Sequence, residues 1–244
     1  IQHQDNDLVL QRIAVGEHLL LGGDNLDIAL AHHMEPQFSQ SKNLSPKDWG
    51  KLTSQCRSAK ENLFQINAPE SWPITLASSG KSIVSSTIKK TINKADASKL
   101  FLEGFLPFQN FEISTLTQQA GFQEFGLPYS AESSITKHLA NFLKKSLEAG
   151  QMPTAILFNG GFFEAPLFKE RVIKTLNQWF QINILELHAT ALDLAVSQGA
   201  AYYGLAKRGR IKKIEGGLPR ATFIGVIDKS GKPKALCLAP LGMD

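Results

Sequence analysis

The sequence predicts an α/β fold with a mostly parallel core, and two observations carry that prediction. The first is the order of elements between residues 155 and 208, where an apolar strand, a glycine turn, a helix, a second strand and a second helix follow one another. This order is typical of an α/β layer. The second is composition, which does not select the fold class but permits a packed fold of this size: 244 residues with 43% hydrophobic side chains suit one large globular domain or two modest ones.

Composition and charge also exclude several classes of protein. A disordered chain would contain fewer apolar residues, and a disulfide-stapled module would need more cysteines than Cys56 and Cys237. Apolar runs are too short to span a bilayer, and a net charge of +4 is too small to argue for nucleic-acid binding. We therefore expect neither a membrane nor a nucleic-acid partner. Few cysteines and no signal peptide favour the cytoplasm.

Residues 13–21 are predicted to form the opening strand, followed by a glycine turn at Gly22 and Gly23. Asp24 is predicted to cap the next helix, which Pro36 should kink or end. The apolar face of this helix is expected to comprise Leu26, Ala29, Leu30, His33 and Met34.

A second helix is predicted to begin with Ser45 as its cap and Pro46 in its first turn. Its apolar residues recur at a spacing of three and four, which makes one stripe along the helix: Trp49, Leu52, Cys56, Ala59 and Leu63. Because Cys56 lies in that stripe, we interpret it as a core residue rather than a nucleophile.

The middle of the chain is predicted to hold a hairpin and three helical stretches. Residues 72–77 and 81–87 flank a turn at 78–80. A helix over 93–107 should direct four residues inward, namely Leu100, Phe101, Gly104 and Phe105. A short helix or turn over 114–121 precedes a helix over 132–147, whose apolar face comprises Ile135, Leu139, Phe142, Leu143 and Leu147.

The last third carries the α/β pattern itself. Residues 155–158 form an uninterrupted apolar run, as expected of a strand buried on both faces. A helix from about Pro166 repeats large apolar residues every four positions, and a strand over 182–187 and a helix over 192–208 follow. Gly209 is predicted to end that last helix.

Basic residues crowd positions 207–213, and a hairpin over 221–227 and 234–238 follows them. No aromatic residue interleaves with these charges, so we interpret them as a solvated linker rather than a nucleic-acid site. The hairpin is predicted to open a separate β-rich domain. Since the chain also begins at Ile1 without methionine, we expect it to be part of a longer protein.

The candidate site is the turn at Asn159, Gly160 and Gly161. Glycines there let a ligand approach the backbone, and ligands of α/β folds bind beyond the carboxyl ends of strands. The alternative is a tight turn that needs a positive φ. Gly22 and Gly23 form a similar turn, so the two turns are predicted to be two walls of one cleft. The sequence contains no catalytic motif and no spacing typical of metal ligands. We therefore predict no catalytic residues and no metal-binding residues in this chain.

Four motifs resemble those of the seventy-kilodalton heat-shock chaperones of the DnaK type, in the order of that family. Residues 21–27 (LGGDNLD) are similar to LGGEDFD, and residues 56–63 (CRSAKENL) to CERAKRTL. Residues 158–166 (FNGGFFEAP) are similar to VGGSTRIP, and residues 192–201 (LDLAVSQGAA) to PDEAVAYGAA. Residues 126–129 and 135–139 further resemble a divergent bacterial branch of that family.

The resemblance implies the second lobe of an actin-like ATPase. Residues 1–23 and 130–209 would be its ribonuclease-H-like base, and residues 24–129 a smaller upper α+β subdomain. Residues 210–244 would be a linker and the first strands of a following β domain, since residues 222–225 are similar to the strand that opens the family's substrate-binding domain.

The resemblance also implies a function and partners. The whole protein would bind ATP or ADP with Mg²⁺ and couple ATP hydrolysis to the binding of client polypeptides. Its partners would be the N-terminal ATPase lobe and C-terminal substrate-binding domain of the same protein, and a nucleotide-exchange co-chaperone. The family's catalytic residues would lie before Ile1, so this chain should not hydrolyse ATP alone.

By the same resemblance, six residues would bind nucleotide. Gly160 and Gly161 would contact phosphate or ribose, Lys60 the ribose, and Asp193 would support the adenine pocket, with Gly22 and Gly23 in the opposite turn.

The chain also departs from the family. The family clamps adenine between two arginines, where this chain has Glu61 and Glu164, so adenine recognition should be altered or lost. Arg57 and Phe64 also depart from the family pattern, and Phe162 or Phe163 is an alternative stacking partner for the base. Two other functions therefore remain open. One is a degenerate, nucleotide-free scaffold, and the other is an actin-like kinase of small molecules.

Overall fold

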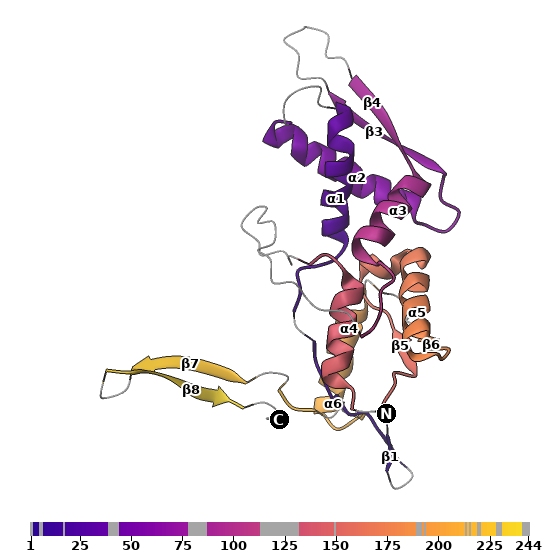
Figure 1. The fold of residues 1–244 in the computed structure, drawn as a ribbon. Helices are drawn as coiled ribbons and strands as arrows, with labels where there is room; N and C mark the ends of the chain where they lie inside the picture. The colour runs from indigo at the N-terminus through magenta and orange to yellow at the C-terminus, as the bar shows by residue number, and fades with distance from the viewer. Residues whose placement is uncertain are drawn as a thin grey trace. The chain divides into compact units, whose positions relative to one another are not determined.

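The computed structural model describes residues 2–4, 7–16, 18–38, 44–77, 87–112, 132–148, 150–188, 192, 194–212, 214, 216–218, 221–227 and 231–240. The chain divides into two compact units, a central unit of residues 19–195 and a terminal unit of residues 1–18 and 196–244. Both contain helices and small sheets, which fits the α/β class in general (Figure 1). The predicted division into a base, an upper subdomain and a following domain stays a prediction.

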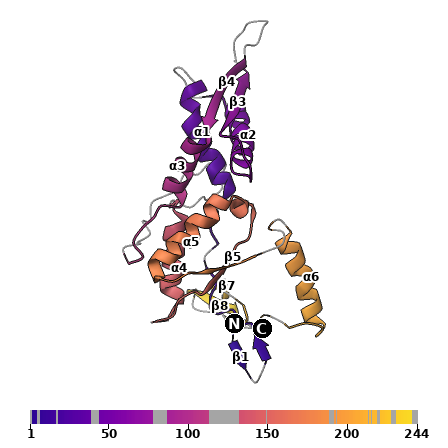
Figure 2. The same ribbon diagram turned by 90° about the vertical axis from the view of Figure 1, so that its right-hand side faces the viewer.

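The first half of the central unit packs three helices against one hairpin (Figures 1 and 2). Strand β3 (Ser71–Ala77) pairs antiparallel with β4 (Thr87–Asn93). The helices are α1 (Gly23–Phe38), α2 (Pro46–Leu63) and α3 (Lys94–Phe105). The predicted hairpin therefore exists, but its second described strand begins at Thr87, where the prediction ended it. Ile88 and Ile92 alternate toward the core in β4, which explains the later strand.

Helix α2 forms as its sequence predicts. Ser45 Oγ accepts a hydrogen bond from the backbone N–H of Asp48 at 3.2 Å, and Pro46 occupies the first turn. The apolar stripe is buried at Leu52, Cys56, Ala59 and Leu63, with Trp49 packed at its edge.

Helix α1 differs from its prediction in two respects. Its buried residues are Leu26, Asp27, Leu30, Ala31, Met34 and Phe38, so the predicted inward residue His33 lies in solvent instead. The buried stripe is thus rotated toward Ala31. Asp24 lies inside the first turn and binds Arg57, while Asn25 Oδ1 accepts the N–H of Gly22.

The second half of the central unit contains a β-α-β arrangement. Helix α4 (Ile135–Ser146) begins after its cap Ser134. Strand β5 (Ala155–Leu157), the short helix η1 (Gly161–Glu164), helix α5 (Pro166–Phe180) and strand β6 (Leu185–Leu187) follow. The two strands pair in parallel, with Ile156 opposite Glu186, which confirms the predicted parallel element.

One prediction about β5 is wrong, because the strand is not buried on both faces. Leu157 is 59% exposed, and its neighbour Leu187 on β6 is 42% exposed. Their exposure shows that no element in the described part of the chain buries these two side chains.

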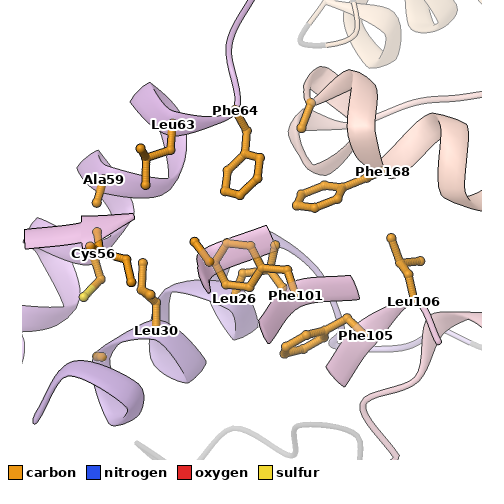
Figure 3. Packing of buried hydrophobic residues seen from close by; sticks show 14 of the residues in the cluster. Leu26, Leu30, Cys56, Ala59, Leu63, Phe64, Phe101, Phe105, Leu106 and Phe168 are labelled. Atoms are coloured by element: carbon orange, nitrogen blue, oxygen red, sulfur yellow. The ribbon is translucent and has the colours of Figure 1, made fainter. Parts of the chain in front are cut away.

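A single hydrophobic core joins the two halves of the central unit. Phe64 at the end of α2, Phe101 of α3 and Phe168 of α5 meet within it (Figure 3). Their ring centroids lie 5.5 to 6.1 Å apart, a range in which aromatic rings attract one another. Phe105 is also buried, but Gly104, predicted to point inward, is exposed.

The terminal unit contains two hairpins and a helix. Strands β1 (Gln2–Gln4) and β2 (Asp7–Val9) pair antiparallel, and so do β7 (Thr222–Ile227) and β8 (Pro233–Ala239), as predicted for the latter pair. The predicted opening strand over 13–21 is wrong. Its described residues form no strand, and Ile13 is 72% exposed, so no described element buries it.

Helix α6 (Ala195–Lys207) ends as predicted, with Gly209 at a φ of +69°. Further along, Arg12 donates hydrogen bonds to the carbonyls of Gly216 and Gly217. Gly216 has a φ of +130°, and a Cβ there would lie 2.9 Å from the Arg12 carbonyl oxygen, so this contact requires glycine.

Four predicted features lie outside the described residues: the turn at 78–80, residues 81–86, the stretch 114–121 and the motif at 126–129. No described helix is both long and apolar enough to cross a membrane.

Candidate functional site

A pocket of about 920 Å³ lies within the central unit, between the start of α1, the end of α2 and the segment that enters α5. Its size is within the range of small-molecule sites, roughly 300–1,000 Å³. It is lined by Gly23, Asp24, Leu26, Arg57, Lys60, Glu61, Phe64, Gln65, Ile66, Gly161, Phe162, Glu164, Ala165 and Phe168.

The two glycine turns contribute one lining residue each. Gly23 lies on one wall and Gly161 on the other, which confirms that the turns form two walls of one cleft. Gly22 and Gly160 adjoin the pocket in sequence but do not line it. Gly160 has a φ of +86° and its carbonyl accepts the N–H of Phe163, so the turn needs this glycine whether or not a ligand binds.

In the wall formed by α1 and α2, a buried carboxylate of α1 forms ion pairs with two cations of α2. The Asp27 side chain is 1% exposed. Its Oδ2 accepts a hydrogen bond from Arg57 Nε at 2.9 Å, and Lys60 Nζ lies 2.6 Å from Oδ1. Arg57 Nη2 also reaches Asp24 at 2.8 Å. The hydrogen bond and charge of Asp27 together raise the pKa of Arg57 above its usual value.

Lys60 of α2 contacts α1 across this wall. Its Nζ donates to the carbonyl of Gly23 at 2.9 Å, while its approach to Asp27 Oδ1 is an ion pair without good hydrogen-bond geometry. A Cβ on Gly23 would lie 3.2 Å from the same Nζ, so a side chain there would press on it. Lys60 is therefore already engaged at the base of the pocket.

Aromatic packing holds the opposite wall. Phe162 stacks on Phe168 with ring centroids 4.9 Å apart, and Phe163 packs on Phe158 at 4.7 Å. Of the two alternative stacking residues in the sequence, Phe162 lines the pocket and Phe163 packs beside it. Phe64 and Phe168 also line the pocket, although both are almost fully buried.

Two carboxylates face the pocket from its two walls. Glu61 comes from the last turn of α2 and Glu164 from η1, and both are exposed. These are the positions at which the resemblance implies arginines in the family. The pocket therefore lacks a guanidinium pair that could stack on a base.

The remaining residues considered in the sequence analysis add nothing to this pocket. Asp193 lies outside the described residues. Among the residues that the structure describes, no three histidine, cysteine or acidic side chains gather as a metal site. Cys56 is fully buried, which confirms its predicted place in the core, and burial, with the charge of Asp27 added, raises the pKa of its thiol to about 12.

Sequence reasoning missed the part of Asp27 in this site. It occupies a position in the buried stripe of α1, with Ala31 and Met34 at the following helical turns. A carboxylate on such a stripe needs a cationic partner. The pair Arg57 and Lys60, three positions apart on the next helix, was the available signal.

No protein-family model and no curated protein matches this chain. Its resemblance to the heat-shock chaperones therefore rests on the four sequence motifs, and its family stays a proposal.

Proposed function

We propose that this chain is the second lobe of an actin-like, chaperone-type ATPase and that its pocket receives the nucleoside part of a bound nucleotide. One observation carries the proposal. Gly23, Lys60 and Gly161, from three motifs that span about 140 positions of the sequence, line one pocket. The resemblance assigns these same residues to nucleotide binding.

The aromatic lining of the pocket supports a ligand with a planar base. Phe162 is half-buried and supplies apolar surface for a base, while Phe64 and Phe168 are buried lining residues that offer little. Stacking of a base on an aromatic ring is worth about 1–3 kcal/mol. Gly161 has open space where a Cβ would stand, so a ligand can approach the backbone of the η1 wall.

In this proposal, the residues of this chain bind and orient the nucleoside part of the nucleotide. The phosphate-transfer machinery would belong to the preceding lobe, so the chain alone should show no ATP turnover. The segment after α6 would connect the lobe to a client-binding domain, with β7 and β8 as the first strands of that domain.

Calorimetric titration of the chain with adenosine and with Mg²⁺–ADP tests the proposal. A half-site should bind at around millimolar, which corresponds to about 4 kcal/mol. Gly161→Leu places a side chain in the pocket and should weaken binding at least about tenfold. Gly104→Leu, on the exposed face of α3, is the matched control and should leave binding unchanged. The absence of binding by both ligands would contradict the proposal.

A nucleotide-free scaffold is the second candidate, and the charge of the pocket favours it. Arg57 and Lys60 are engaged by Asp24 and Asp27, and Glu61 and Glu164 would oppose a phosphate. This function predicts that the complete protein, as well as this chain, binds neither adenosine nor ADP.

A further inference from the structure

The pocket carries an excess of negative charge. Its two cations, Arg57 and Lys60, are matched by Asp24 and the buried Asp27. Glu61 and Glu164 form no ion pair within the described part of the chain and line opposite walls. The charge of Glu61 also acts on Arg57, as the smallest cause of its raised pKa, but the four carboxylates at this pocket still outnumber its two cations by two, so a ligand here meets a net negative charge.

Carboxylates distinguish sharply between the two ends of a nucleotide. An ionised carboxylate only accepts hydrogen bonds, and ribose hydroxyls and an exocyclic amino group donate them. Such charge-assisted bonds are roughly twice as strong as neutral ones. A phosphate offers acceptors and negative charge, so the same carboxylates repel it.

We propose that Glu61 and Glu164 make this pocket selective for the uncharged nucleoside over its polyphosphate, accepting hydrogen bonds from hydroxyl and amino groups of the ligand. The inference rests on the proposed function, since it assigns a ligand class to the same pocket. It adds that affinity here comes from the base and ribose, while the phosphates of a nucleotide weaken binding to this lobe.

The test compares adenosine with Mg²⁺–ATP by calorimetry at ionic strengths of about 0.01 and 0.15 M, where the Debye length is about 30 and 8 Å. Adenosine should bind at least as tightly as ATP, with an affinity that salt leaves unchanged. ATP affinity should rise several-fold at the higher salt, because screening weakens repulsion. An attractive phosphate site would show the opposite dependence.

The variant Glu61→Gln with Glu164→Gln removes both charges and keeps a carbonyl acceptor at each position. It should strengthen ATP binding by about tenfold at low salt and weaken adenosine binding a few-fold. Glu103→Gln, an exposed substitution on α3 outside the pocket, is the matched control and should change neither affinity. Both glutamates are exposed, so circular dichroism should show an unchanged fold.

Three results would overturn the inference. They are tighter binding of ATP than of adenosine by the unaltered chain, a shift of both affinities in the same direction in the double variant, and no shift in either. In each of these results a ligand still binds, so the proposed function survives. Absence of binding by both ligands would instead overturn the proposed function itself.

Discussion

The core of the central unit and the β7–β8 hairpin are built from similar apolar residues and differ in what covers them. Phe168 is 2% exposed between α2, α3 and η1, whereas Phe223 on β7 is 59% exposed. An apolar alternation therefore specifies strand pairing, while burial depends on a further layer packed against the strands. In the hairpin that layer is not among the described residues.

The two cysteines give the largest expected contrast between these regions. Cys56 lies in the core with its pKa raised to about 12, and Cys237 is exposed on β8. Because the thiolate is the reactive form, iodoacetamide at pH 8 should label Cys56 at least about a thousandfold more slowly than Cys237. Mass spectrometry of labelled peptides measures both rates. Equal rates in the folded chain would contradict a closed core.

Truncating the two phenylalanines should separate the regions by several kcal/mol. Phe168→Ala removes a ring that contacts Phe64, Phe101 and Phe162, and should lower the free energy of unfolding by about 3–5 kcal/mol. Phe223→Ala should change it by less than about 0.5 kcal/mol. Urea unfolding followed by circular dichroism measures both. A loss from Phe223→Ala that matched the loss from Phe168→Ala would show that the hairpin is also buried.

Asp27→Asn tests the ion pairs between α1 and α2, and its effect is also measured as a change in the free energy of unfolding. The amide keeps the shape but loses the charge shared by Arg57 and Lys60, so unfolding should cost about 2 kcal/mol less. Glu170→Gln removes the exposed pair with Lys174 on α5 and should change stability by less than about 0.5 kcal/mol. If the two variants lost equal stability, the buried carboxylate would not hold the wall.

The smallest effect is a pH dependence at the start of α4. Burial alone would raise the pKa of Glu132, but hydrogen bonds from Lys137 and the N–H of Ser134 outweigh it, so the pKa is lowered. When the pKa of a carboxyl is lower in the folded chain than in the unfolded one, its ionised form stabilises the fold. This contribution is fully present when the pH lies above the pKa in the unfolded chain, about 4.3, and it is lost as the pH falls through the lower pKa of the folded chain.

Glu132→Gln should therefore cost less than about 1 kcal/mol at neutral pH. The difference in unfolding free energy from the unaltered chain should shrink between pH 5 and 3. A difference that stayed constant over this interval would contradict the assigned cause.

Local signals in the sequence predicted the elements that local contacts determine. Helix α2 has its cap, proline and stripe within one continuous segment, and the β7–β8 hairpin has its turn and both strands nearby. The β1–β2 hairpin has few apolar residues to mark it, so its strands were not predicted. The inward position predicted for His33 is wrong because the spacing of apolar residues indicates a helix clearly but indicates less clearly which side of that helix is buried.

The candidate site was only partly predictable for a related reason. The glycine turns are visible as local breaks in the pattern, and they did predict two walls of one cleft. The partnership of Asp27 with Arg57 spans 30 positions, and the contact of Phe162 with Phe168 depends on how η1 enters α5. Such contacts follow from the packing of whole elements, so residue types alone do not specify them.

We propose that a nucleoside occupies the pocket between α1, α2 and η1, and this proposal can be tested directly. Two-dimensional ¹H–¹⁵N NMR of the labelled chain during titration with adenosine tests it residue by residue. If the nucleoside binds there, the amide signals of Gly23, Ile66 and Gly161 should shift progressively, while the signals of Ile224 and Leu236 in the hairpin should not move. Binding that left those three signals unchanged, or that shifted the hairpin instead, would contradict it.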